Sequence, residues 1–304
     1  LQQKESRIYA GSGVSQTPKI TIRRKEKEMA YLGLRKPIIA DMKEDGSYNE
    51  PFACGKAVGV TVTPNYAEAS QYGDDGKAEY DKEFVDADVT LNTTTLPVVA
   101  HQKLFGHTVT EKNVKFNADD QNKDVGMGWI TQEKVDGKRK FISNILFKVK
   151  FSDPSEDYST RGENIEYKTP SISGKASALD NGQWKETEEH ETATAALAWI
   201  YGKFGYTLGT LQVQSAEGTE TGTTHLTVTP EKTGQNVYMY KTGVDVELPA
   251  YNDVCSVANG WKSWDGTSDV SATSGQKIVV AEVEAQTFAA KKAGTTTVTA
   301  KTGA

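Results

Sequence analysis

Turn signals typical of antiparallel hairpins divide this sequence into short segments rich in β-branched and aromatic residues. Asp-Asp-Gly at 74–76, Val-Asp-Gly-Lys at 135–138 and Asp-Asn-Gly at 180–182 each separate two such segments. Glycine preceded by aspartate or asparagine favours these turns because both residues tolerate positive φ. The sequence therefore predicts a mainly β fold, with a long first hairpin over 55–94 and further hairpins around the other two turns.

Two segments instead have the periodicity of short helices. Residues 97–106 begin with proline and end with glycine, which favour the first turn and the end of a helix, respectively. Residues 192–205, TATAALAWIYGKFG, form the second segment. The side chains expected to face the core from these two helices are Val98, Val99, Leu104, Phe105, Ala195, Ala198, Trp199 and Phe204.

The composition changes near residue 210, where threonine, valine and glycine become more frequent. The segments HLTVTP, NVYMYK, VDVELP, KIVVAEVE and TTTVTAK have the spacing typical of a β-sandwich. We expect a first domain over 29–209 and a small immunoglobulin-like β-sandwich over 211–304. Residues 1–28 are polar and basic, which indicates a disordered arm or a translated leader that precedes a true start at Met29.

The charge is unevenly distributed along the chain. Residues 1–28 carry seven Lys or Arg against three Asp or Glu, whereas the remainder carries 28 against 38. An acidic body disfavours tight binding of nucleic acid, because affinity for phosphates comes mainly from Lys and Arg. No apolar run reaches the length of about 18 residues typical of a membrane helix, and no secretory signal is recognisable. Cys54 and Cys255 are far apart and are expected to be reduced.

Motifs for catalysis, cofactors and metals are missing, so the sequence predicts no enzyme, no catalytic residue, no cofactor and no metal site. The four histidines are scattered, and none belongs to an H-E-x-x-H pattern. Neither a G-x-S-x-G elbow nor a phosphate-binding glycine-rich loop is present. The segment from Asp120 to Asp124 begins like a calcium loop, but Val125 and Thr131 occupy the positions of the required glycine and glutamate.

Several segments of the first domain carry a resemblance to a known family. They are the opening MAYLGLRKPIIADM, the long first hairpin, the block ILFKVKFSDPSEDYSTRGENIEYKTPSISGKA and the helix TAALAWIYGKFG. Together they resemble the major tail proteins of long-tailed bacteriophages over residues 29–204. The C-terminal part, in YMYKTGVDVELPAY and KKAGTTTVTAK, is similar to the immunoglobulin-like domains that some of these proteins append.

The resemblance implies a tail-tube β-sandwich or half-barrel with a flanking helix. Six copies would close a ring, stacked rings would form a tube, and its acidic lumen would conduct DNA during ejection. The resemblance also implies a tape-measure protein, a tail terminator and tail-tip proteins as partners, and no membrane. Assembly would take place in the bacterial cytoplasm, and the protein would reside in the virion tail. A closed ring would satisfy sheet edges that a monomer leaves open.

Candidate site residues follow from this interpretation. Carboxylates of the first hairpin would either face the lumen and repel phosphates or lie on an ordinary outer surface, and they are Glu79, Asp81, Glu83, Asp86 and Asp88. The loops 43–50 and 153–164 are either contacts between rings or ordinary surface loops. Trp261 and Trp264 are either core residues of the sandwich or a platform for glycan stacking.

Two other classes of protein remain open. A cell-surface or glycan-binding β-sandwich adhesion protein would account for the sandwich and its tryptophans, but it is expected to carry an export signal or an anchor, and none is recognisable. A hydrolase of cell-wall glycans needs a convergent pair of acids or a metal, which the motifs do not supply. Adjacent carboxylates such as Glu188 and Glu189 point to opposite faces of a strand.

Overall fold

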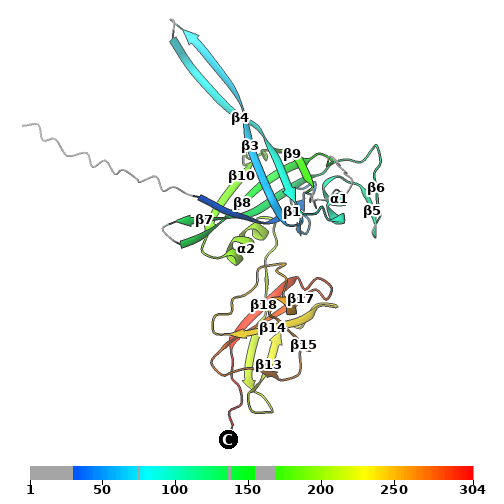
Figure 1. Ribbon diagram of the computed structural model, residues 1–304, viewed down its shortest axis with the longest axis vertical. Coiled ribbons are helices and arrows are strands. Elements are labelled where there is room, and N and C mark those ends of the chain that lie inside the picture. The colour runs from blue at the N-terminus through cyan, green and yellow to red at the C-terminus, as the bar shows by residue number, and fades with distance from the viewer. Residues whose placement is uncertain (1–29, 74–75, 112, 136–137, 155–168, 304) are drawn as a thin grey trace, which may run out of the picture.

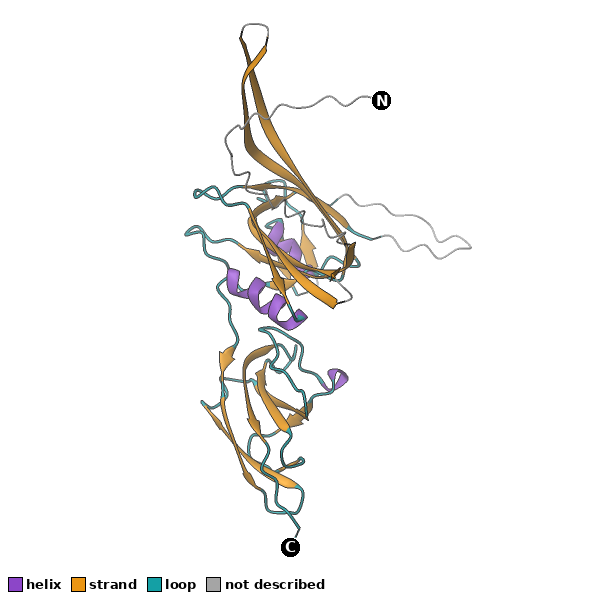
Figure 2. Cartoon of the chain, turned by 90° about the vertical axis from the view of Figure 1, so that its left-hand side faces the viewer, coloured by secondary structure: helices purple, strands orange, loops and turns teal. Residues whose placement is uncertain are grey.

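The computed structural model describes residues 30–73, 76–111, 113–135, 138–154 and 169–303. These residues form a mainly β structure with open sheets, which confirms the predicted fold class at this level. We call residues 30–206 the N-terminal part and residues 209–303 the C-terminal sandwich (Figure 1, Figure 2). Segment 1–28, the turn at 74–75 and most of the 153–164 loop lie outside the described residues.

One eight-stranded antiparallel sheet makes up most of the N-terminal part. Its strands are β1 (Ala30–Asp41), β2 (Phe52–Ala53), β3 (Ala57–Gly73), β4 (Gly76–Thr93), β7 (Asp124–Val135), β8 (Lys138–Phe151), β9 (Ser171–Ser177) and β10 (Lys185–His190). Their order is β2-β1-β7-β8-β9-β4-β3, and β10 also pairs with β8. Because β9 and β10 occupy successive stretches of one edge of β8, the turn at 180–182 joins strands that do not pair with each other, and the predicted third hairpin is wrong.

Strand alternation gives this sheet two apolar faces. Ile39 lies on the face that packs with α1 (Val98–Leu104), whereas its neighbour Ile38 lies on the face covered by α2 (Ala193–Lys203). The α1 face is closed by the inward residues of β4, so the sheet curls around its own core (Figure 1). Each helix thus covers a different apolar cluster.

Both predicted helices are present, and Leu104, Phe105 and Phe204 are buried as predicted, but the rest of their buried faces differs from the prediction. Val98 and Val99 are 41% and 37% exposed. α2 leaves Ala195 and Ala198 exposed. The residues that the two helices bury are Ala100, Leu104, Ala196, Leu197, Ile200 and Tyr201. Short segments that are apolar on most sides do not define which face turns inward, so packing against the sheet decided it.

β3 and β4 form the predicted long first hairpin, paired from Ala57 opposite Thr93 to Gly73 opposite Gly76. β9 pairs with β4 only near the base of this hairpin, from residue 87 onward. The outer half, residues 66–73 and 76–84, is a two-stranded arm that projects beyond the sheet (Figure 1). A two-stranded ribbon is marginally stable by itself, so contacts at its base determine whether it stays ordered.

The C-terminal sandwich consists of two packed sheets. The larger contains β11 (Gly209–Thr210), β14 (Val237–Gly243), β15 (Lys262–Trp264), β17 (Lys277–Val283) and β18 (Ala290–Thr297). The smaller contains β12 (Gln212–Glu217), β13 (Thr223–Thr229) and β16 (Val270–Ser271). The segment 244–261, with the short helix η1 (Val257–Asn259), covers the outer face of the larger sheet, and VDVELP within it is a loop where a strand was predicted.

The two parts meet at a joint formed by the loop 249–253 of the sandwich. Ala250 is 2% exposed and belongs to the apolar cluster under α2. The ring of Tyr251 meets Tyr201 edge-on at 5.5 Å and lies 5.6 Å from Tyr206. The sandwich therefore contributes side chains to the core of the N-terminal part.

Polar contacts complete the joint. Tyr251 Oη donates to Glu50 Oε1 at 2.9 Å. Lys291 Nζ also donates to Glu50, and it donates to Asn252 Oδ1 at 2.7 Å. Lys36 Nζ lies 2.7 Å from Asp253 Oδ1. Ionic and aromatic contacts thus both join the sandwich to the N-terminal part.

Candidate functional site

Asp86 and Asp88, two of the predicted acidic residues, lie at the base of the arm on one face of β4. Asn65 Nδ2 donates to Asp86 Oδ1 at 2.7 Å and to Asp88 Oδ2 at 2.8 Å. Lys175 Nζ, on β9, lies 3.1 Å from Asp86 Oδ1 and 2.9 Å from Asp88 Oδ1. Sequence reasoning missed Asn65 and Lys175, because only strand pairing brings them to these carboxylates.

A β-bulge brings other predicted acidic residues to the same face. The register of the hairpin shifts between Asn65 and Tyr66, which leaves Val85 as an extra residue in β4. The alternation of side chains shifts with it, so Asp81 and Glu83 join the face of the inner pair, and both are exposed. The acidic face therefore comprises Asp81, Glu83, Asp86 and Asp88.

Donors hold the inner pair of this face in the charged form. Hydrogen bonds from Asn65 and then from Lys175 lower the pKa of Asp86 and Asp88 below the ordinary aspartate value. Hydrogen bonds to Asp88 and Asp86 raise the pKa of Lys175. One lysine thus neutralises part of the negative charge at the base of the arm. The side chain of Glu79 lies outside the described residues.

The opposite face of the arm is aromatic and ionic. Phe84 stacks on Trp184 at 4.7 Å, and Tyr66 meets Phe84 edge-on at 6.0 Å. Further out, Lys82 Nζ lies 4.2 Å from the centre of the Tyr66 ring and 3.1 Å from Glu68 Oε1. Phe84 and Trp184 pack against the buried cluster beside α1, so these contacts connect the arm to the core. The hairpin register, which places Tyr66 opposite Phe84, decides these contacts.

Open strand edges and exposed apolar side chains occur together in this region. Among the residues that the structure describes, β3 is the last strand of its sheet, and β2 pairs with β1 only at Ile38 and Ile39. Such edges pair with other chains unless they are protected. Among the described side chains of the hairpin, the large apolar ones that are exposed, each between 43% and 56%, are Val58, Tyr66, Tyr80 and Val85. The hairpin is therefore a candidate surface for contact between proteins.

The two tryptophans considered for glycan stacking are core residues. Trp261 is 7% exposed and packs on the outer face of the larger sheet, and Trp264 is 6% exposed between the two sheets. Trp264 Nε1 donates to the Ser268 carbonyl at 2.7 Å. Stacking needs an open ring face, and neither indole presents one. The structure therefore corrects the suggestion of a glycan platform at these positions.

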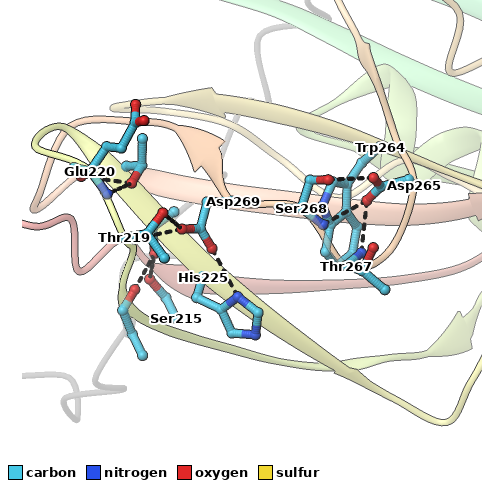
Figure 3. A network of polar contacts seen from close by, with 12 residues as sticks. Ser215, Thr219, Glu220, His225, Trp264, Asp265, Thr267, Ser268 and Asp269 are labelled. Atoms are coloured by element: carbon cyan, nitrogen blue, oxygen red, sulfur yellow. Dashed lines mark hydrogen bonds and ion pairs between the residues drawn. The ribbon is translucent and has the colours of Figure 1, made fainter.

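Two aspartates organise the loops at one end of the sandwich (Figure 3). Asp265 Oδ1 accepts from the backbone N–H groups of Thr267 and Ser268 at 2.8 and 2.7 Å. Asp269 Oδ2 accepts from the Thr219 backbone N–H at 2.6 Å, and its Oδ1 lies 2.9 Å from His225 Nδ1. The Thr219 amide is the main cause that lowers the pKa of Asp269 to about 2. Asp265 thus fixes its own turn and Asp269 joins its segment to Thr219 and His225, which are structural roles.

Two histidines that are apart in the sequence meet beside α1. His101 Nδ1 lies 3.3 Å from His107 Nδ1, and Phe116 covers the His107 ring at 4.3 Å. Phe116 follows the two-stranded ribbon of β5 (Thr108–Thr110) and β6 (Asn113–Lys115). Asp153 Oδ1 lies 3.6 Å from His107 Nε2. Among the described residues, no group of three or more His, Cys, Asp or Glu is arranged to hold a metal ion.

Comparison with known families places a similarity in the C-terminal sandwich. Residues 216–301 match the family model described as S-layer protein SbsC C-terminal domain, which is less than a third of the chain. No curated protein matches the chain. Within the described part of the chain, no helix has the length and apolar character needed to cross a membrane.

This match corrects the interpretation based on phage tails. It points to a cell-surface protein, so the assignment to major tail proteins, the role as a DNA-conducting tail tube and the location in the virion were wrong. The tape-measure, terminator and tail-tip partners rested on the same resemblance and stay untested predictions. Over residues 216–301, this chain is similar to the C-terminal domain of an S-layer protein.

Proposed function

We propose that this chain is a structural protein of a cell surface, which carries its C-terminal sandwich as a surface domain and contacts other copies through its N-terminal part. The observation that supports the location is the match of residues 216–301 to the S-layer protein domain. The matched residues run from the end of β12 beyond β18, so they form most of one packed unit. The match therefore corresponds to a folded module.

The N-terminal part supports contact between copies. Among the described residues, its sheet ends in β3, whose outer half extends beyond the other strands, and in β1, which β2 pairs only at Ile38 and Ile39; the curl of the sheet brings the base of β3 close to β1. The acidic face lies next to the first edge, and exposed Lys134, Lys138 and Arg139 lie at the β7–β8 turn beside the second. A contact between two different edges is heterologous, so it extends from copy to copy into a ring or a filament.

The joint supports a structural role in a second way. Two-domain chains with small polar interfaces generally move about their linkers. Here the loop 249–253 inserts Ala250 into the apolar cluster under α2, and Tyr251 lies between an aromatic pair and Glu50. The sandwich is thus held at a defined angle to the surface that contacts neighbours.

The location is tested on intact cells of the source organism. Antibodies raised against residues 211–303 are expected to label intact cells, and external protease is expected to remove the labelling. A cytoplasmic enzyme serves as the control, because it becomes accessible only after lysis. Labelling that appears only after lysis would show that the chain is not a surface protein.

Contact between copies is tested with purified protein. Val85→Asp adds a charge to the exposed apolar surface of the hairpin, where Val85 is 56% exposed. We expect this change to reduce association measured by analytical ultracentrifugation and electron microscopy. Val244→Asp is the matched control, because Val244 is 73% exposed but belongs to the sandwich. Equal association of the two variants would exclude the hairpin as the contact.

A further inference from the structure

Three side chains of the C-terminal sandwich converge from three neighbouring strands. Glu282 on β17 lies directly opposite Lys292 on β18. On its other side, Glu282 lies opposite Tyr238 of β14. Asn236 precedes Tyr238 by two positions, just before β14 begins, so it is directed to the same face. A lysine and an asparagine from strands that do not pair with each other are thus brought to one carboxylate.

The contacts are short and the carboxylate is fully enclosed. Lys292 Nζ lies 2.8 Å from Glu282 Oε2, and Asn236 Nδ2 donates to Glu282 Oε1 at 2.7 Å. The backbone N–H of Thr233 donates to the same Oε1 at 2.8 Å, and Lys292 also donates to Thr233 Oγ1 at 2.7 Å. Glu282 is 0% exposed, and the Lys292 side chain is 25% exposed. The amine and the amide therefore bind opposite oxygens of one buried carboxylate.

This arrangement contains the parts of an acyl-transfer reaction. A lysine amine is a nucleophile once it has lost a proton, and a buried carboxylate that touches it is placed to accept that proton. The asparagine amide is the electrophile, and its Nδ2 already contacts the same carboxylate. Because both groups contact one carboxylate in the folded chain, their reaction is a unimolecular step and needs no bimolecular encounter.

We propose that Lys292 and Asn236 form an intramolecular amide bond with Glu282 as the proton-transfer group. Glu282 accepts a proton from the Lys292 ammonium, and the neutral Nζ attacks Asn236 Cγ. The bond between Cγ and Nδ2 breaks after Glu282 returns the proton to Nδ2. Ammonia leaves and takes up the second proton from Nζ, so one ammonium ion is released and no oxidant or cofactor is needed.

A second lysine in the sandwich provides an internal comparison. Lys291 Nζ donates to Asn252 Oδ1 at 2.7 Å and contacts Glu50 and Glu284. These carboxylates have side chains 49% and 40% exposed, so water surrounds the acid groups at that cluster. A hydrated carboxylate is a poorer proton-transfer partner than an enclosed one. The reaction is therefore expected at Lys292 and not at its neighbour.

The link would fasten the start of β14 to β18 across the intervening β17. It closes a loop that contains most of the sandwich, including β15, β16 and β17. A covalent bond at this position keeps β14 and β18 from separating when the sandwich is pulled. This property goes beyond the proposed location at a cell surface and does not depend on it.

Mass spectrometry of the full-length protein tests the proposal. Trypsin is expected to yield one branched peptide in which residues 233–241 are joined to residues 292–301, with a mass about 17 Da below the sum of the two, because ammonia is lost. Fragmentation locates the link at Asn236 and Lys292. Separate peptides 233–241 and 293–301 without any branched species, from protein aged after purification, would overturn the proposal.

Variants separate the reaction from folding. Glu282→Gln keeps the shape of the side chain but removes the proton acceptor, and Lys292→Arg removes the nucleophile, so the branched peptide is expected to vanish in both. Lys291→Arg is the matched control and is expected to retain it. If Glu282→Gln does not fold, Asn236→Ala leaves Lys292 and Glu282 paired and is expected to lack the link. A branched peptide that persists in Glu282→Gln or in Asn236→Ala would refute the assigned roles.

Discussion

Tyr251→Ala tests whether the joint holds the two parts of the molecule together. Tyr251 meets Tyr201 at 5.5 Å and Tyr206 at 5.6 Å, and its hydroxyl donates to Glu50 at 2.9 Å. The Nζ of Lys291 lies 4.8 Å from the centre of its ring. The contacts with Tyr201, Tyr206 and Glu50 join the sandwich to the N-terminal part, and the contact with Lys291 supports the loop 249–253 that makes this joint. The substitution removes them without changing either sheet.

The expected loss follows from these contacts. Each aromatic pair contributes about 0.5–1.5 kcal/mol, and a hydrogen bond contributes about 1 kcal/mol net. The cation–π contact is partly solvated, and it adds about 0.5 kcal/mol. Because such contributions are not fully additive, we expect the free energy that favours the closed joint to fall by about 2–4 kcal/mol. That corresponds to about a 30- to 900-fold change in the equilibrium between closed and open joints.

Fluorescence energy transfer measures this equilibrium. Dyes attached at Glu44→Cys and Gln286→Cys, two exposed positions in different parts, report the distance between them. Urea added below the unfolding transition of either part opens the joint, and Tyr251→Ala should open it at a lower concentration. Val257→Ala, at an exposed position of the same sandwich, is the control. A change in Tyr251→Ala no larger than in Val257→Ala would refute the reasoning.

The remaining predictions concern the pH dependence of the joint, the close packing of β18 against the Leu211 carbonyl, and the order of the arm. Burial acts to raise the pKa of Glu50, but hydrogen bonds from Lys291 and Tyr251 outweigh burial and lower this pKa. The joint should therefore be fully stabilised above the ordinary glutamate pKa and should weaken as the pH falls through the lowered pKa, which the same pair of dyes would measure. Glu50→Gln should remove this pH dependence. Gly294→Ala would place a Cβ 2.0 Å from the Leu211 carbonyl oxygen, so the free energy of unfolding of the sandwich, measured by calorimetry, should fall by about 2 kcal/mol or more. An unchanged melting temperature would contradict so close an approach of β18 to this carbonyl. Phe84→Ala removes the stacking on Trp184 that anchors the arm, so the amide hydrogens of residues 66–70 should exchange faster with solvent. The amide hydrogens of the sandwich should keep their exchange rates. Equal protection of residues 66–70 in the variant and in the unaltered protein would show that the arm does not need this contact.

Local patterns predicted much of the fold. Turn signals located the long hairpin and the β7–β8 hairpin, because short-range backbone preferences decide where a chain reverses. The third turn forms as well, with Gly182 donating to the Leu179 carbonyl at 2.8 Å, yet its flanking strands pair with β8. A turn signal states where the chain bends and leaves open which remote strand each arm of the bend will join.

The candidate site was predictable in part. Alternation placed Asp86 and Asp88 on one face of a strand, as the structure shows. Their partners Asn65 and Lys175 come from two other strands, and the bulge at Val85 that adds Asp81 and Glu83 has no clear sequence signature. The sequence showed that these side chains are acidic, but the register of the strands decided which residues lie next to them.

The proposed function rests on the comparison with a known family more than on sequence patterns. The resemblance to tail proteins rested on segments whose features are those of many β proteins, namely hairpins, a short helix and an acidic surface. The match over residues 216–301 concerns the sandwich, for which the sequence alone had indicated an immunoglobulin-like fold and a resemblance to domains appended to tail proteins. The rival interpretation as a cell-surface protein is the one that this match favours.

The sequence by itself determined that the chain is mainly β, where two of its hairpins turn, and which strand positions alternate between core and solvent. These properties depend on neighbouring residues, whose backbone preferences and polarity act over a few positions. Only the tertiary structure decided the phase of α2, the insertion of Tyr251 between the two parts and the meeting of Lys292, Glu282 and Asn236. Such contacts join residues far apart in the chain, and their geometry depends on strand register and packing, which no local pattern specifies.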